Sequence, residues 1–460
     1  MSESRGQLNV MRVTPHAPLR GSFAATELLT NPTFESGTTG WADPTPANSS
    51  IAVQDRVLRV TRKVGGSVNP QIDPSSLPTV VQYAPYCMRG FFGRYRGAPQ
   101  LTAYFHDGTA LVTGVPSAVA GMATATQVAR STTLSQLAWY DASTSGGVAD
   151  DYFDIHFTSF ARCALVDNGP NMLLQSEAFG TSWSVARGSV SSNAVASPDG
   201  ATTADNFVED GTAGVHTLSQ SVSVSSSALD YVFSVAVKAN TRTFVMLQMV
   251  EATSSTTLQQ YFNLTTGAVG STGATGANWA GRRAFTVALG NGWTRCYLVG
   301  RKTNAATSIS CDIFGASADG TVSYTGGSAV AFALWGASAA QSSVPVKYTS
   351  TTTTSAAATA QTGGALTVKG LSASTSGLLE NGDWFEVIGQ LKQCTSRLNS
   401  NAAGLGEIPF RPALADSPAD NDPVIVNQPF GRFIYPGGRE MENLFGVYAD
   451  CEMNLEEIYV

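Results

Sequence analysis

Short segments in which apolar and polar side chains alternate at every second residue recur along this chain of 460 residues. The run 231–238, YVFSVAVK, is the clearest, and glycine-containing clusters such as 318–320 and 325–327 separate runs of this kind. Alternation with a period of two is typical of strands with one buried face. No stretch of ten or more residues carries the apolar period of a helix. The sequence therefore predicts an all-β fold of many short strands.

The composition supports sandwiches or barrels over a helical or a disordered protein. Charged residues are only 13% of the chain, against roughly 25% in ordinary soluble domains, and 45 residues are glycine. Hydrophobic residues reach 43%, which is enough to form packed cores. At roughly 150 residues per domain, this length suggests about three domains. Composition and periodicity together therefore favour several β-sandwiches or barrels.

Changes in composition divide the chain into five parts. We expect an extended N-terminal docking arm at 1–23 and a first module at 24–168. A second module follows at 170–350, and a Ser/Thr/Ala linker, flexible or extended, at 351–364. The last part, 365–460, is expected to form the small β-domain.

The two expected modules begin in the same way. In each, a pair of leucines is followed by a mostly polar stretch, a phenylalanine and then a tryptophan: Phe34 with Trp41, and Phe179 with Trp183. A first strand that delivers the phenylalanine to the core, a turn, and a tryptophan that closes the sandwich edge explain the pattern. We interpret the two stretches as copies of one module.

These segments also resemble known modules. The opening LLTNPTFESGTTGW resembles the start of carbohydrate-binding jelly rolls. The second module is similar to modules of tail and structural proteins of tailed bacteriophages, in the following segments: 171–183, 196–205 (ASPDGATTAD), 292–295 (GWTR), 334–337 (LWGA) and 346–349 (VKYT). The likeness covers about 171–350 well and 24–168 loosely. It implies that the two modules are jelly rolls, so we expect tandem jelly-roll β-sandwiches followed by a small β-barrel-like domain.

The third part resembles small β-domains of phage virion proteins. Its segment 379–389, LENGDWFEVIG, looks like the strand opening of those domains, and 408–414 and 417–422 continue the pattern. That resemblance implies a place in a virion and no particular chemistry.

The resemblances together imply a non-enzymatic structural component of a tailed-phage virion. We expect a tail, neck or fibre protein that is assembled in the host cytoplasm, forms homo-oligomers and contacts other virion proteins of the tail, neck or portal-adaptor region. Host-surface attachment to a polysaccharide is a further expectation. Two alternatives remain open here: a tail-fibre enzyme that degrades or deacetylates polysaccharide, and a capsid decoration or head-fibre protein.

Charge and hydropathy argue against two classes of partner. The net charge is −7 and the pI about 5.2, whereas nucleic-acid surfaces need clustered Lys and Arg. No run of about 18 apolar residues is present, so we expect no membrane insertion. The six cysteines are scattered without a CxxC pair, which predicts free and mostly buried thiols.

Catalysis has little support in the sequence. Glycosidases need two carboxyl groups across a cleft, and the aspartates of 150–154 and of 416–422 are the candidates. The segment 150–158 is explained more simply as a loop that enters a strand, with Phe153, Ile155 and Phe157 forming a core stripe. We therefore expect no catalytic residues.

Sugar binding would need aromatic rings that stack on pyranose rings, and each aromatic has core packing as its alternative. The candidates are Trp139, Tyr140, Trp279, Trp293, Phe92 and Arg94. No cofactor is expected except a structural calcium ion, which the resemblance to carbohydrate-binding jelly rolls implies. Its oxygen ligands would come from Glu35, Asp43 and Asp154.

The N-terminal arm has a basic character. Arg5, Arg12 and Arg20 lie in a stretch without acidic residues between Glu3 and Glu27. Prolines within it favour an extended conformation, and 440–460 is acidic. The pattern suggests that the arm docks on another subunit or a neighbouring copy, by strand addition or charge complementarity; an unstructured tail is the alternative.

Overall fold

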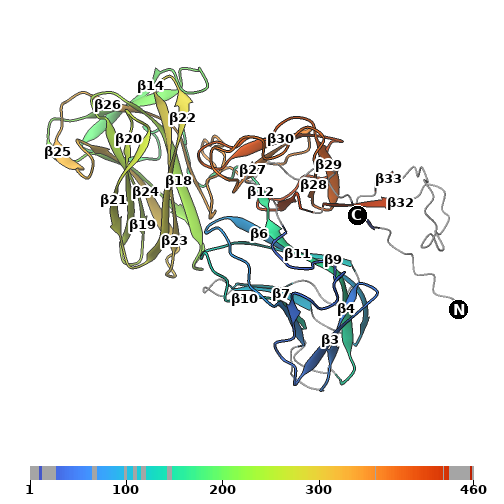
Figure 1. Cartoon of the computed structure of the whole chain (residues 1–460). Coiled ribbons are helices and arrows are strands. Elements are labelled where there is room, and N and C mark those ends of the chain that lie inside the picture. The colour runs from blue at the N-terminus through green and yellow to red at the C-terminus, as the bar shows by residue number, and fades with distance from the viewer. Residues whose placement is uncertain are drawn as a thin grey trace.

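The chain forms two β-sandwiches and a β-barrel (Figure 1), as seen in a computed structural model. The structure describes residues 10–12, 27–64, 70–97, 101–106, 111–114, 121–141, 148–357, 359–427, 429–434 and 456–457. Within these residues the regular elements are all strands, which confirms the all-β prediction. The described part of the chain contains no helix long and apolar enough to cross a membrane.

The first sandwich packs two five-stranded sheets face to face. One has the order β2 (Trp41–Ala42), β5 (Gln71–Pro74), β10 (Gln136–Asp141), β7 (Leu101–His106) and β8 (Leu111–Gly114). The other has the order β3 (Ser49–Gln54), β4 (Val57–Arg62), β11 (Tyr152–Arg162), β6 (Pro85–Arg96) and β9 (Gly121–Val128). Phe153 and Ile155 of β11 pack in the core, as the alternation predicts. Phe157 is buried but lies outside this core cluster, because the strand register shifts between Ile155 and Phe157.

The second sandwich has two six-stranded sheets. One has the order β13 (Ser184–Ala186), β17 (Thr217–Ser223), β24 (Ser308–Ala316), β19 (Phe244–Glu251), β20 (Thr257–Asn263) and β21 (Ala268–Thr275). The other has the order β14 (Gly188–Val195), β15 (Ala204–Glu209), β26 (Val330–Ala340), β18 (Asp230–Ala239), β23 (Trp293–Lys302) and β22 (Trp279–Gly290). A separate ribbon pairs β16 (Ala213–Val215) with β25 (Ser323–Thr325).

The two sandwiches share one topology. If β21 and β22 are set aside, each strand of the second sandwich occupies the position of its counterpart in the first. In both, the eight strands that end at β11 or β26 interleave as 1-8-3-6 in one sheet and 2-7-4-5 in the other, which is the jelly-roll order. The predicted repeat of one jelly-roll module is therefore confirmed, and β21 with β22 extends each sheet of the second copy by one edge strand.

The matching starts of the modules have matching geometry. Phe34 packs against Trp41 with ring centroids 5.6 Å apart, and Phe179 packs against Trp183 at 5.0 Å. Each indole N–H donates to a backbone carbonyl of a residue with positive φ, Asn31 in the first copy and Gln175 in the second. The segments that carry both phenylalanines are turns; the strand expected at this place in each module is absent.

The barrel closes six short strands. Their order is β12 (Ala164–Val166), β27 (Ala365–Lys369), β30 (Gly406–Arg411), β29 (Gln390–Cys394), β28 (Trp384–Val387) and β31 (Pro423–Ile425). The strand expected at the GDWFEV segment is β28. The predicted first-module boundary at 168 differs from the structure, because β12 follows β11 after one residue yet pairs with β27 and β31. The amino-acid composition around β12 does not reveal that this strand pairs with the barrel and not with the first sandwich.

The linker predicted at 351–364 is bound to its neighbours. Ala356 forms a β-bridge with Asn171, and the carbonyls of Thr351 and Thr352 accept bonds from the start of the second module. Gln361 bonds to the backbone of Asp167 at 3.1 Å between Nε2 and O. The segment is extended as predicted, but these bonds attach it to the second sandwich and the barrel, so it is not a flexible linker.

The chain termini meet in a small sheet beside the barrel. β1 (Val10–Arg12) pairs with β32 (Phe430–Ile434), which also pairs with β33 (Glu456–Glu457). Arg12 lies opposite Phe430, so strand addition by the arm occurs here within the chain. Arg5 and Arg20 lie outside the described residues. The five cysteines in the described part are free and buried.

Candidate functional site

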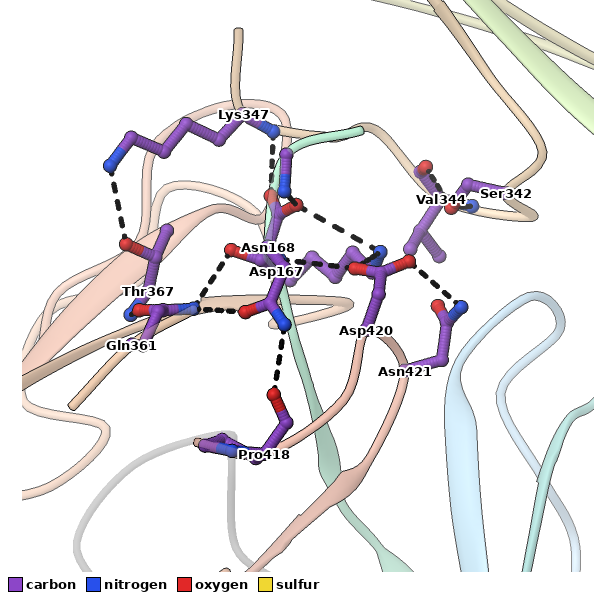
Figure 2. A network of polar contacts seen from close by, with 12 residues as sticks. Asp167, Asn168, Ser342, Val344, Lys347, Gln361, Thr367, Pro418, Asp420 and Asn421 are labelled. Atoms are coloured by element: carbon purple, nitrogen blue, oxygen red, sulfur yellow. Dashed lines mark hydrogen bonds and ion pairs between the residues drawn. The ribbon is translucent and has the colours of Figure 1, made fainter. Parts of the chain in front are cut away.

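Two features qualify as candidate sites: a buried charge network between the second sandwich and the barrel, and one polar, aromatic sheet face. The network is centred on Lys369, the last residue of β27. Figure 2 shows its two carboxylates, Asp167 and Asp420. Its ammonium lies 2.8 Å from Asp420 Oδ1 and 3.9 Å from Asp167 Oδ1. Lys369 and Asp167 have no exposed side-chain surface. Asp420, at the edge of the network, is 15% exposed, so the centre of the network is closed to solvent while its edge is not.

Asp167 links three segments of the chain. Its carboxylate accepts bonds from the backbone N–H groups of Lys347, at 2.6 Å, and Gly169, at 3.1 Å. Burial raises the pKa of Asp167, against the lowering effect of Lys369 and these donors. Figure 2 shows Gln361 beside it, donating to Asn168 Oδ1 at 2.7 Å. The end of the second module, the extended segment and the barrel thus share one hydrogen-bond network.

A second buried ion pair joins the first sandwich to the barrel. Arg89 of β6 and Glu386 of β28 approach to 2.7 Å, and both side chains are buried. Within the first sandwich, Arg62 of β4 and Asp141 of β10 pair at 2.9 Å between the two sheets. Buried pairs of this kind are costly to break once formed, so the units are joined by specific contacts.

The outer face of the sheet β2-β5-β10-β7-β8 carries a different set of groups. Tyr140 pairs with Thr102 on one side and Gln71 on the other, and the register places Tyr104 and His106 on the same face. All are half-buried except Thr102, which is buried. The opposite face presents Trp139, Leu137 and Phe105 to the core.

The aromatic rings of this face contact one another and lie beside amides and a carboxylate. Tyr104 is T-shaped to Tyr140 at 6.0 Å and stacked on His106 at 5.8 Å. Gln71 Nε2 donates to Asp73 Oδ1 at 3.4 Å. Burial raises the pKa of Asp73 to about 6, a value that includes a lowering by the hydrogen bond with Gln136 and a smaller increase from Asp43. Aromatic rings next to amide donors and acceptors suit a ligand rich in hydroxyl groups. We call this surface the tyrosine face.

Most of the predicted sugar-binding residues are core residues. Trp139, Trp279, Trp293 and Phe92 are 0%, 4%, 2% and 4% exposed, so none of them can stack on a sugar in this structure. The indole N–H groups of the three tryptophans bond inside the protein, as with Trp139 to Thr158 at 2.9 Å. This part of the prediction is corrected: three of the rings fill the space between the sheets, and Trp293 packs in a separate buried cluster. Of the six candidates, Tyr140 lies on the tyrosine face, and the Arg94 side chain lies outside the description.

The predicted calcium ligands are engaged separately. Asp154 forms a two-point ion pair with Arg59, at 2.7 and 2.8 Å, and Glu35 faces Arg56 at 3.4 Å. Asp43 Oδ1 accepts bonds from Thr45 and Ser49. In the described ranges no three His, Cys, Asp or Glu side chains form a metal-binding group. The calcium set expected from the sequence is thus not assembled there.

Tyr104, Gln71 and His106 were not among the residues predicted from the sequence. Tyr104 and His106 lie two residues apart on β7. Their shared face with Tyr140 depends on the pairing of β7 with β10, and pairing register is not visible in one strand. The sequence does indicate that Tyr140 and the adjacent Trp139 lie on opposite faces of a strand, but it does not indicate which of the two faces is the core.

Comparison with known proteins adds no relative. The chain matches no known family description, and no curated protein is significantly similar to it.

Proposed function

We propose that this protein is a non-enzymatic structural component of a tailed-phage virion, in its tail, neck or fibre, which assembles with other virion proteins and copies of itself. One observation supports the proposal most: two jelly rolls of the same strand order are joined to one barrel, the first by the buried Arg89–Glu386 ion pair and the second by the hydrogen bond from Lys347 to Asp167. Repetition of one module in a cohesive unit is typical of building proteins. The phage-like segments of the second module and of the barrel supply the virion context.

Particle localisation tests this proposal. Gradient-purified virions of the phage that encodes the chain are expected to contain it in fixed stoichiometry, and cryo-electron microscopy should place it in a closed ring or fibre at the tail or neck. Finding the chain only in the soluble lysate, or only on the capsid shell, would contradict the proposal; the second outcome favours a head decoration protein.

Attachment to a host polysaccharide through the tyrosine face is a second candidate function. It is favoured by Tyr104 and Tyr140, which are half-buried side chains on an outer sheet face beside amide groups. The ligand would be a neutral or amino-sugar chain, since hydroxyl-rich rings stack on aromatic side chains.

The Tyr104→Ala variant is expected to lower affinity for host surface polysaccharide about tenfold, since one ring–sugar contact contributes roughly 1.4 kcal/mol. Titration calorimetry with extracted host polysaccharide measures it. Tyr95→Ala is the matched control: this ring is 44% exposed and lies on β6 in the other sheet. Equal affinities of the unmodified protein, Tyr104→Ala and Tyr95→Ala for the polysaccharide would exclude the tyrosine face as the binding surface.

A further inference from the structure

A cleft of about 610 Å³ lies where the two sandwiches and the barrel meet. The first module contributes Tyr83 and Arg162, β22 contributes Arg283, and the barrel contributes Ser372. The walls are mostly apolar: Val81, Ala84, Phe285, Val344, Pro345 and Leu371. No Asp or Glu is among the described residues that line it. We call it the junction cleft.

Arg283 lacks a partner of opposite charge in the junction cleft. Its guanidinium carbon lies 3.9 Å from the centre of the Tyr83 ring. Its Nε and Nη2 atoms are buried without a hydrogen-bond acceptor in the described structure. Burial lowers the pKa of Arg283 to about 10. Arg283 as a whole is half-buried, but buried N–H groups normally have an acceptor, so these two donors require an explanation.

Arg162 also enters the cleft without a carboxylate. It donates to Ser372 Oγ at 2.8 Å and to the Gly370 carbonyl at 3.3 Å, whereas its Nε is buried without an acceptor. The carboxylate of Asp230 acts on Arg283 electrostatically and raises its pKa. It is already paired with Arg130 at 3.2 Å and Arg301 at 3.4 Å. Positive charge therefore exceeds negative charge at this junction, although the whole chain has a net charge of −7.

We propose that the junction cleft binds an organic carboxylate with an apolar body. The carboxylate would accept hydrogen bonds from Arg283 and Arg162, and the body would lie along Phe285 and Leu371. The cleft volume falls within the range of ligand sites, roughly 300–1,000 Å³, and mostly apolar walls with a few oriented polar groups are typical of them. Guanidinium groups match carboxylates because planar N–H donors meet two acceptor oxygens.

The first test compares two probe molecules of one shape on the unmodified protein. 1-Naphthoate is expected to bind in titration calorimetry, and its neutral isostere 1-naphthamide about tenfold more weakly or not at all, because only the naphthoate supplies charge to Arg283. Equal affinities for the two, or no binding of naphthoate at millimolar concentration, would overturn the proposal.

The second test changes the arginine. Arg283→Gln is expected to weaken naphthoate binding about tenfold, and to leave the melting temperature equal or higher, because the variant removes a buried charge without a counter-ion. Arg282→Gln is the matched control, since Arg282 lies next to it on β22 and bonds instead to the carbonyls of Gln259 and Gly273. If Arg282→Gln weakens binding as much as Arg283→Gln, or if Arg283→Gln leaves it unchanged, the assignment is wrong.

Discussion

Replacing Lys369 by methionine is expected to lower the free energy of unfolding by about 3–5 kcal/mol, the usual cost of removing one member of a buried ion pair. Lys369 lies between Asp420 and Asp167 and is fully buried. Without the Lys369 ammonium, the carboxylates of Asp167 and Asp420 remain near each other with no cation between them. Urea denaturation and calorimetry of the whole chain measure the loss, which we expect in the transition that includes the barrel.

The pH dependence of this variant provides an internal check. Burial already raises the pKa of Asp167 above its unfolded value of about 3.9, and loss of Lys369 raises it further. A carboxyl group with a raised folded pKa destabilises the protein above that pKa, and this cost is removed as the pH falls towards the unfolded value. The stability difference from the unmodified protein should therefore narrow between pH 7 and pH 4.

The matched control is an exposed ion pair of the same barrel. Arg397 and Glu380 approach to 3.0 Å, with side chains 57% and 41% exposed. Arg397→Met is expected to change stability by less than about 1 kcal/mol. A Lys369→Met loss as small as that of Arg397→Met, or a difference that does not depend on pH, would contradict the role assigned to the network.

Replacing Trp139 by alanine is expected to destabilise the first sandwich by about 3–5 kcal/mol. The side chain has 0% exposure, packs edge-on against Phe92 at 5.0 Å and donates a hydrogen bond to Thr158. Its removal leaves a cavity between the sheets. Denaturation followed by hydrogen exchange of β6, β10 and β11 assigns the loss to this sandwich.

The adjacent residue is the control for that prediction. Tyr140 lies on the outer face of the same strand and is only half-buried, so Tyr140→Ala should cost about 1 kcal/mol or less. Substitutions at the two neighbouring positions should thus differ severalfold in stability. Similar losses at both positions would show that β10 does not divide its side chains between core and surface as described.

Local patterns were sufficient for several features of the fold. Alternation over 231–238 predicted a strand, and β18 spans it with Tyr231, Phe233, Val235 and Val237 buried. The Phe and Trp at the start of each module predicted a repeat, and the equal strand orders confirm it. Both signals are local, because side-chain direction along a strand and turn chemistry depend on neighbouring residues.

The candidate sites were predicted poorly because they depend on distant pairings. Trp139 and Tyr140 are adjacent and both suit sugar stacking, yet the facing sheet decides which is buried. The junction cleft brings together Tyr83, Arg162 and Arg283, which are far apart in the sequence. The change of β12 from sandwich to barrel likewise depends on its partners β27 and β31.

The sequence by itself determined the all-β class, the two jelly-roll copies and the strand at 384–387, since two-residue alternation and turn residues act over a few positions. Only the tertiary structure decided which aromatic rings are buried, which carboxylates pair with Lys369, and where unpaired arginines meet an apolar cleft. The reason is that burial and charge pairing depend on which distant strand or sheet packs against a segment. The register of that pairing cannot be deduced from either segment alone.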